Sequence, residues 1–158
     1  MTKECKQQFT LRITQANATD LVVILYEMLL CYLEDAENAL DQNDSMAFQE
    51  AVRKMRGCLN ELIQSLHAEY EPAKELQKLY LFCIRRLARA QVKENASFLE
   101  EIRRVIEPLH DAYMQVAKQN HSGPLMGNSQ TVYAGLTYGK NTLAENMADQ
   151  GFNRGMLI

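Results

Sequence analysis

Apolar residues recur at helical spacing along four stretches of the chain, and polar or turn-forming residues separate these stretches. The pattern predicts helices over residues 17–42, 45–69, 72–93 and 97–119. Short connections between long helices place consecutive helices antiparallel to one another. The sequence therefore predicts an all-α fold, namely an antiparallel up-down four-helix bundle with a C-terminal extension.

Capping residues mark three of the predicted helix starts. Asn17 and Asp20 have the spacing of a capping box, and so do Ser97 and Glu100. Residues 43–45, Asn-Asp-Ser, form a turn that also caps the helix that follows.

The composition changes after Asn120, where a Gly-Pro linker begins. We therefore divide the chain into an N-terminal arm (residues 1–16), the four-helix bundle (17–119) and the C-terminal extension (120–158). A disordered tail is usually poorer in aromatic residues than this extension, so we expect the extension to pack on the bundle. The residues expected to do so are Val132, Tyr133, Leu136, Tyr138 and Leu143.

Two of the predicted helices carry more apolar residues than a bundle core requires. The surplus lies among charged positions in helices 17–42 and 72–93. Such a helix is central and buried all round, or forms a groove for a partner, or is covered by the chain's own termini. The last two alternatives can hold at different times. An apolar patch rimmed by charge is typical of an interaction site, so we predict a partner-binding groove formed by Val23, Ile24, Leu30, Cys31, Leu81 and Phe82.

Charge and hydropathy exclude two classes of partner. The net charge is −3, and nucleic-acid binding usually requires a basic face. Arg85, Arg86, Arg89 and Lys93 share one helical arc, which we interpret as a solvated face. The longest apolar run, residues 21–28, is too short to span a bilayer. We therefore expect neither nucleic-acid binding nor membrane insertion.

The cysteines and histidines indicate no metal or cofactor site. The four cysteines form no CxxC pair and suit a reduced cytoplasmic protein: Cys5, Cys31, Cys58 and Cys83. Di-iron bundles use Glu-x-x-His on two helices, and only Glu107 and His110 have that spacing. We therefore expect no enzymatic activity.

Two motifs resemble those of the flagellin-export chaperones, the FliS family. The first helix matches the family signature Val-x-Thr-Ala-Ser-Pro-x-Glu-Leu and its apolar run ending in Leu-Tyr at Ile13, Ala16, Leu21, Leu25 and Tyr26. Here Asn17, Ala18 and Asp20 replace the family's Ser, Pro and Glu. Residues 75–87 resemble the family's Leu-x-x-Leu-Tyr-x-Tyr-Met-x-Arg-Arg-Leu. The resemblance covers residues 8 to 119, although Phe9 stands near the position of the family's N-terminal tyrosine.

The resemblance implies a cytosolic chaperone that binds the disordered C-terminal segment of flagellin. Such a chaperone prevents premature polymerisation and aids delivery to the flagellar type III export apparatus, whose export-gate components are further expected partners. Physically, an apolar helical segment would dock in a groove of the bundle, and we expect the C-terminal extension to cover that groove until flagellin displaces it. The alternative is a helical-bundle adaptor or structural protein that binds another amphipathic segment. The sequence leaves a homo-oligomer open.

Overall fold

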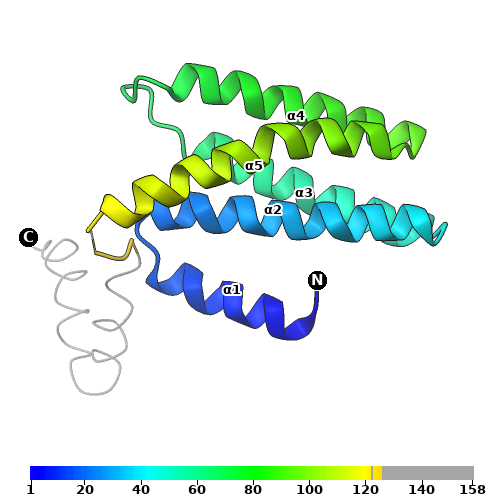
Figure 1. Cartoon of the computed structure of the whole chain (residues 1–158), viewed down its shortest axis with the longest axis horizontal. Helices are drawn as coiled ribbons and strands as arrows, with labels where there is room; N and C mark the ends of the chain where they lie inside the picture. The colour runs from blue at the N-terminus through cyan, green and yellow to red at the C-terminus, as the bar shows by residue number, and fades with distance from the viewer. Residues whose placement is uncertain (122, 126–158) are drawn as a thin grey trace, which may run out of the picture.

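The computed structural model describes residues 1–121 and 123–125, and within them the chain forms α-helices and no strand (Figure 1). In chain order the helices are α1 (Lys3–Gln15), α2 (Ala18–Asp41), α3 (Ser45–Gln64), α4 (Ala73–Lys93) and α5 (Ala96–Gln119). The predicted all-α class is confirmed over this part of the chain. The five residues of the extension that were expected to pack on the bundle lie outside the described residues.

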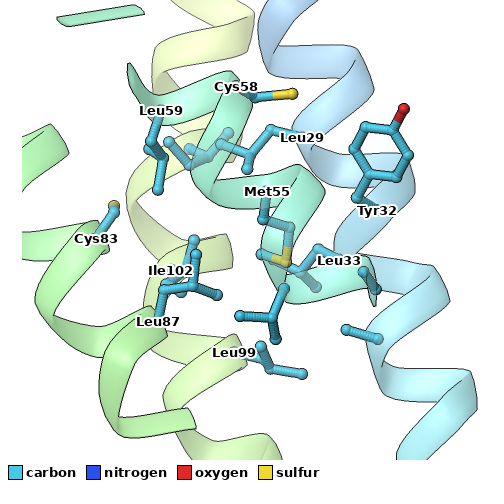
Figure 2. Packing of buried hydrophobic residues seen from close by; sticks show 14 of the residues in the cluster. Leu29, Tyr32, Leu33, Met55, Cys58, Leu59, Cys83, Leu87, Leu99 and Ile102 are labelled. Atoms are coloured by element: carbon cyan, nitrogen blue, oxygen red, sulfur yellow. The ribbon is translucent and has the colours of Figure 1, made fainter. Parts of the chain in front are cut away.

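The four long helices enclose the main core. Helix α2 contacts α3 and α5, and α4 contacts the same two helices. Figure 1 shows these four helices side by side, with α1 lying along α2. Each of the four supplies buried side chains to the core, as Figure 2 shows for Leu29, Leu33, Met55, Leu59, Cys83, Leu87, Leu99 and Ile102. This core is the scaffold on which α1 sits.

The predicted caps of α2 and α3 are confirmed. The Asn17 side chain accepts from the Asp20 backbone N–H at 2.8 Å, and the Asp20 carboxylate accepts from the Asn17 N–H at 3.3 Å. This capping box fixes the start of α2. The Asp44 carboxylate accepts from the Ala47 N–H at 3.0 Å and caps α3. Both caps depend on residues within one turn, which is why the sequence reveals them.

Helix α3 is shorter than predicted, because it ends at Gln64 and not near residue 69. The Ser65 hydroxyl donates to the Leu62 carbonyl at 2.7 Å. The Leu66 N–H bonds to the Ile63 carbonyl at 3.2 Å, which tightens the last turn. Residues 67–71 are exposed, so no buried side chain anchors a further turn.

The predicted capping box of Ser97 and Glu100 is wrong. Asn95 caps α5 instead, and its side chain accepts from the Ser97 N–H at 2.8 Å. The reason lies one residue earlier, where Glu94 ends α4 in the left-handed conformation with φ 47°. The chain has therefore turned before Asn95, which takes the extended conformation that an N-cap needs.

A pair of buried tyrosines joins α2 to α4. The hydroxyl oxygens of Tyr26 and Tyr80 are 2.5 Å apart, and the two side chains are 0% and 1% exposed. The ring of Tyr113 meets that of Tyr26 edge-on, with 5.7 Å between the centroids. Burial raises the pKa of both paired phenols, so the hydroxyls stay protonated and one donates to the other.

Replacing Tyr80 by phenylalanine should destabilise the fold by about 1–3 kcal/mol, because the Tyr26 hydroxyl would be left buried without a partner. The double variant Tyr26→Phe/Tyr80→Phe should be more stable than the sum of the single variants predicts, since it removes both polar groups together. Urea unfolding monitored by circular dichroism measures these free energies. Simple additivity of the two substitutions would contradict a mutual hydrogen bond.

Candidate functional site

Helix α1 lies antiparallel on the outer side of α2 (Figure 1). Two ion pairs fix its register. The amino group of Met1 is 2.5 Å from Asp35 Oδ1, and Arg12 Nη1 is 2.5 Å from Glu27 Oε2. The later residue of the first segment, Arg12, pairs with the earlier residue of α2, Glu27, so the two helices run in opposite directions. The direction follows from the connection, because only residues 16–17 separate the two helices.

A second apolar cluster lies between α1 and α2, and three of its half-buried members, Met1, Leu21 and Met28, also pack against the main core. Its buried members are Phe9, Ala16 and Ile24, of which Ile24 is 2% exposed. Half-buried residues pack around them: Met1, Cys5, Ile13, Leu21, Met28 and Cys31. The α2 residues of this cluster form what we call the α1-covered face: Leu21, Ile24, Met28 and Cys31. Helix α1 is the cover that keeps this face from water.

The attachment of α1 is modest compared with that of the other helices. Leu11 on its outer side is 60% exposed. The Arg12 side chain is 47% exposed, and an ion pair of this kind contributes no more than about 1 kcal/mol. The hydrogen bond to Glu27 raises the Arg12 pKa, although partial burial opposes the rise. The two large buried residues of this contact, Phe9 and Ile24, are not among the residues of the main core.

The structure places the predicted groove residues in more than one environment. Ile24 and Cys31 lie together beneath α1. Val23 is also buried, at 6% exposed, whereas Leu30 is half-buried against the main core. Thus two of the four predicted α2 residues belong to the α1-covered face.

The two predicted residues of α4 lie apart from the α1-covered face. Leu81 is 40% exposed. Phe82 is half-buried against the main core, and the guanidinium of Arg86 lies 5.0 Å from its ring centroid. Helix α4 packs on α3 and α5, so the structure does not bring Leu81 and Phe82 together with Ile24.

Cover by the chain's own termini was one of the three alternatives for the surplus face of α2, but the sequence did not predict a helix at Lys3–Gln15. Cys5, Phe9, Ile13 and Ala16 follow one another at intervals of four, four and three residues, which is the spacing of one helical face. This stripe is short and lies among polar residues, so the sequence alone predicts only an N-terminal arm (residues 1–16) here. The helical spacing is visible in the sequence, but it predicts a covering helix only when it is considered together with the surplus apolar face of α2.

A second feature lies where α2 begins. An apolar cavity of about 410 Å³ opens there, and its lining includes Leu21, Val22, Leu66, Tyr113, Val116 and Leu125. Leu21 belongs both to this cavity and to the α1-covered face. The two surfaces are therefore adjacent.

The chain after α5 returns across the link between α1 and α2. The Asn120 side-chain amide donates to Thr19 Oγ1 at 2.7 Å, and the Leu125 N–H donates to the Ala16 carbonyl at 2.7 Å. Leu125 thereby reaches the rim of the apolar cavity. The C-terminal extension consequently starts beside the α1-covered face.

Burial disfavours the thiolate form of three of the cysteines. Burial raises the pKa of Cys58 and of Cys83 to about 12, and both lie in the main core. Burial and the nearby Cys5 and Glu34 raise the pKa of Cys31 to about 11.

Across residues 1–121 and 123–125, no group of three or more His, Cys, Asp or Glu side chains is arranged to hold a metal ion. In the same ranges no helix combines the length and the apolar character needed to cross a membrane.

Comparison with known proteins gives two matches. A family model described as "Flagellar protein FliS" matches residues 1–120, which is more than half of the chain. The flagellar secretion chaperone FliS of Bacillus subtilis (strain 168) is 24% identical over 103 residues, covering 65% of this chain and 77% of that protein. The region matched by the family model, residues 1–120, includes α1 as well as the four long helices.

Proposed function

This chain belongs to the FliS family of flagellar proteins, and on that premise we propose that it is a cytoplasmic export chaperone for flagellin. It binds the disordered C-terminal segment of flagellin, prevents premature polymerisation and aids delivery to the flagellar type III export apparatus. The observation that carries the proposal is an apolar face of α2 that is covered by a helix lying outside the main core. A chaperone needs such a surface in a form that is hidden when empty and available when a client arrives.

Helices α2 to α5 form the scaffold in this proposal, as the antiparallel up-down bundle that the sequence predicts. The contacts of α2 and α4 with α3 and α5 support that arrangement. No residue of α1 is among the buried residues of the main core. The α1-covered face can therefore change its occupant while the scaffold stays folded.

Flagellin would bind by replacing α1. An amphipathic segment of flagellin folds against the α1-covered face and buries Ile24, Leu21 and Met28 in the helix-in-groove manner. Because α1 must detach first, the measured affinity is the intrinsic affinity multiplied by the fraction of molecules in which the face is open. Helix α1 thus sets how tightly flagellin is held, and a moderate affinity suits a client that must be released for export.

The C-terminal extension would act at the adjacent cavity. We propose that its residues Val132, Tyr133, Leu136, Tyr138 and Leu143 bind the apolar cavity beside Leu21 and shield it until flagellin arrives. The position of Leu125 at the rim supports this proposal, because the following residues start within reach of the cavity. Tethering raises the effective concentration of such a segment to roughly the millimolar range.

The other proposed partners follow from the same role. Components of the export gate would receive the complex, and a second copy of the chain is a further candidate for the exposed apolar residues of α4 and α5. A helical-bundle adaptor that binds another amphipathic segment is the alternative function. It predicts the same detachable α1 without selectivity for flagellin.

Gel filtration of the purified protein with flagellin tests the function. We expect the two proteins to elute together as one complex, and we expect flagellin that lacks its C-terminal segment to elute separately. The same flagellin lacking an equal length of its central region is the matched control and should still bind. Equal binding of all three flagellin forms, or of none, would contradict the proposal and favour the adaptor.

A further inference from the structure

We propose that Cys5 and Cys31 are a redox-sensitive thiol pair whose disulfide fastens α1 over the α1-covered face. The formation of the disulfide is independent of the proposed function. Its effect on flagellin binding rests on that function, because α1 blocks a client only if clients bind where α1 lies.

The register of α1 on α2 places the two cysteines opposite each other. Met1 pairs with Asp35 at one end of the contact, and Arg12 pairs with Glu27 towards the other end. Cys5 follows Met1 by four residues, and Cys31 precedes Asp35 by four residues. Since a helical turn takes 3.6 residues and the helices are antiparallel, both cysteines lie about one turn inside the Met1–Asp35 pair.

The surroundings of the pair agree with this register. Both cysteines are half-buried free thiols, and both pack against the cluster formed by Phe9, Ala16 and Ile24. The Cys5 thiol lies near Cys31 and contributes to raising the pKa of the Cys31 thiol. Half-burial keeps the thiols within reach of a small oxidant.

The other two cysteines provide an internal contrast. Cys58 is 5% exposed and Cys83 is 0% exposed, and both belong to the main core. A buried thiol of this kind is inert to oxidants until the protein unfolds. Oxidation of the native protein should therefore be selective for the pair that joins α1 to α2.

The chemistry requires an external two-electron oxidant, for which a low-molecular-weight disulfide suffices. The thiolate of one cysteine attacks that disulfide, forms a mixed disulfide and releases one small thiol. The second cysteine then loses its proton, attacks the protein sulfur of the mixed disulfide and releases the other small thiol. Two cysteine S–H bonds and one small S–S bond are broken, and one protein S–S bond and two small thiols are formed.

The facing groups set the pH dependence of this reaction. Cys31 of α2 faces Cys5 of α1 and lies near Glu34 and Asp35 of α2. Because burial and these neighbours raise the Cys31 pKa to about 11, its thiolate is scarce at neutral pH and becomes commoner as the pH rises. Oxidation should consequently be slow at pH 7 and faster at pH 8.5.

The test treats the full-length protein with oxidised glutathione at pH 8.5 and digests it with trypsin without reduction. We expect the peptide 4–6 to appear linked to the peptide 13–53, which contains Cys31 but no other cysteine. The Cys5→Ser variant should lose this product. The Cys58→Ser variant, matched in chemistry but located in the main core, should retain it.

The functional arm measures flagellin binding by calorimetry before oxidation, after oxidation and after reduction with dithiothreitol. We expect oxidation to weaken binding at least tenfold, reduction to restore it, and Cys5→Ser to be indifferent to the oxidant. Absence of the linked peptide would overturn the thiol pair. A linked peptide with unchanged flagellin affinity would overturn the fastening of α1. If the reduced protein bound no flagellin, the proposed function would fail, while the linked peptide would still support the pair.

Discussion

The Ile24→Asp variant should lose flagellin binding at least about 100-fold, or about 2.7 kcal/mol, while its main core stays folded. A carboxylate at this position would be buried without a partner under any apolar segment that docks there, which is strongly unfavourable. Ile24 is 2% exposed, yet its contacts are to the cluster beneath α1 and not to the main core. Calorimetry with flagellin measures the affinity, and thermal unfolding monitors the core.

Two further variants separate the surface from its cover. Leu11→Asp changes an exposed residue on the outer side of α1, so it should leave binding unchanged. Phe9→Ala removes the main apolar anchor of α1 but leaves the α1-covered face intact, so flagellin should bind several-fold more tightly as the open fraction rises. If Phe9→Ala instead weakened binding, α1 would be part of the binding surface. If Ile24→Asp unfolded the four long helices, Ile24 would belong to their core.

Features that depend on neighbours in sequence could be predicted. The capping box of Asn17 and Asp20 and the cap at Asp44 require only side chains within one turn. The apolar stripes that meet around Met55 and Ile102 are likewise local patterns, because helical spacing puts them on one face. For the same reason, the all-α class and the approximate extent of the four long helices followed from the sequence.

Features that depend on tertiary contacts could not be predicted in the same way. The surplus apolar residues of α2 indicated that something covers that helix, but three interpretations were left open. The cover is α1. Its apolar stripe of Cys5, Phe9 and Ile13 contains few large apolar side chains, and the helix is stabilised by contact with Ile24 and Met28 of α2. The position of Leu81 and Phe82 on a different side from Ile24 likewise depends on which helices are neighbours.

Helix ends that depend on competing local bonds were also missed. The apolar periodicity of the sequence does not distinguish a helix that ends at Gln64 from one that continues to residue 69. The Ser65 hydroxyl and the exposed residues after Leu66 decide the outcome. At α5, two residues suited to capping stood close together, and the left-handed conformation of Glu94 selected Asn95 over Ser97.

Deleting residues 128–158 should tighten flagellin binding about tenfold. If the extension binds the apolar cavity with a dissociation constant of roughly 0.1 mM, an effective concentration of roughly 1 mM keeps the cavity occupied in about nine molecules of ten. Flagellin then competes with the extension and finds the cavity open in only about one molecule of ten. Removal of the extension opens the cavity in every molecule and raises the measured affinity about tenfold. The deletion leaves Asn120 and Leu125 in place, so their bonds to Thr19 and Ala16 still hold the link before α2.

A full-length variant distinguishes shielding from simple obstruction by a long tail. Replacing Val132, Tyr133, Leu136, Tyr138 and Leu143 by serine keeps the length of the extension and removes its apolar anchors. Shielding predicts that this variant binds flagellin as tightly as the deletion does, because the cavity beside Leu21 is open in both. Obstruction predicts that only the deletion gains affinity. Unchanged binding by the deletion would refute both, and weaker binding would also indicate that the extension contributes directly to the flagellin-binding surface.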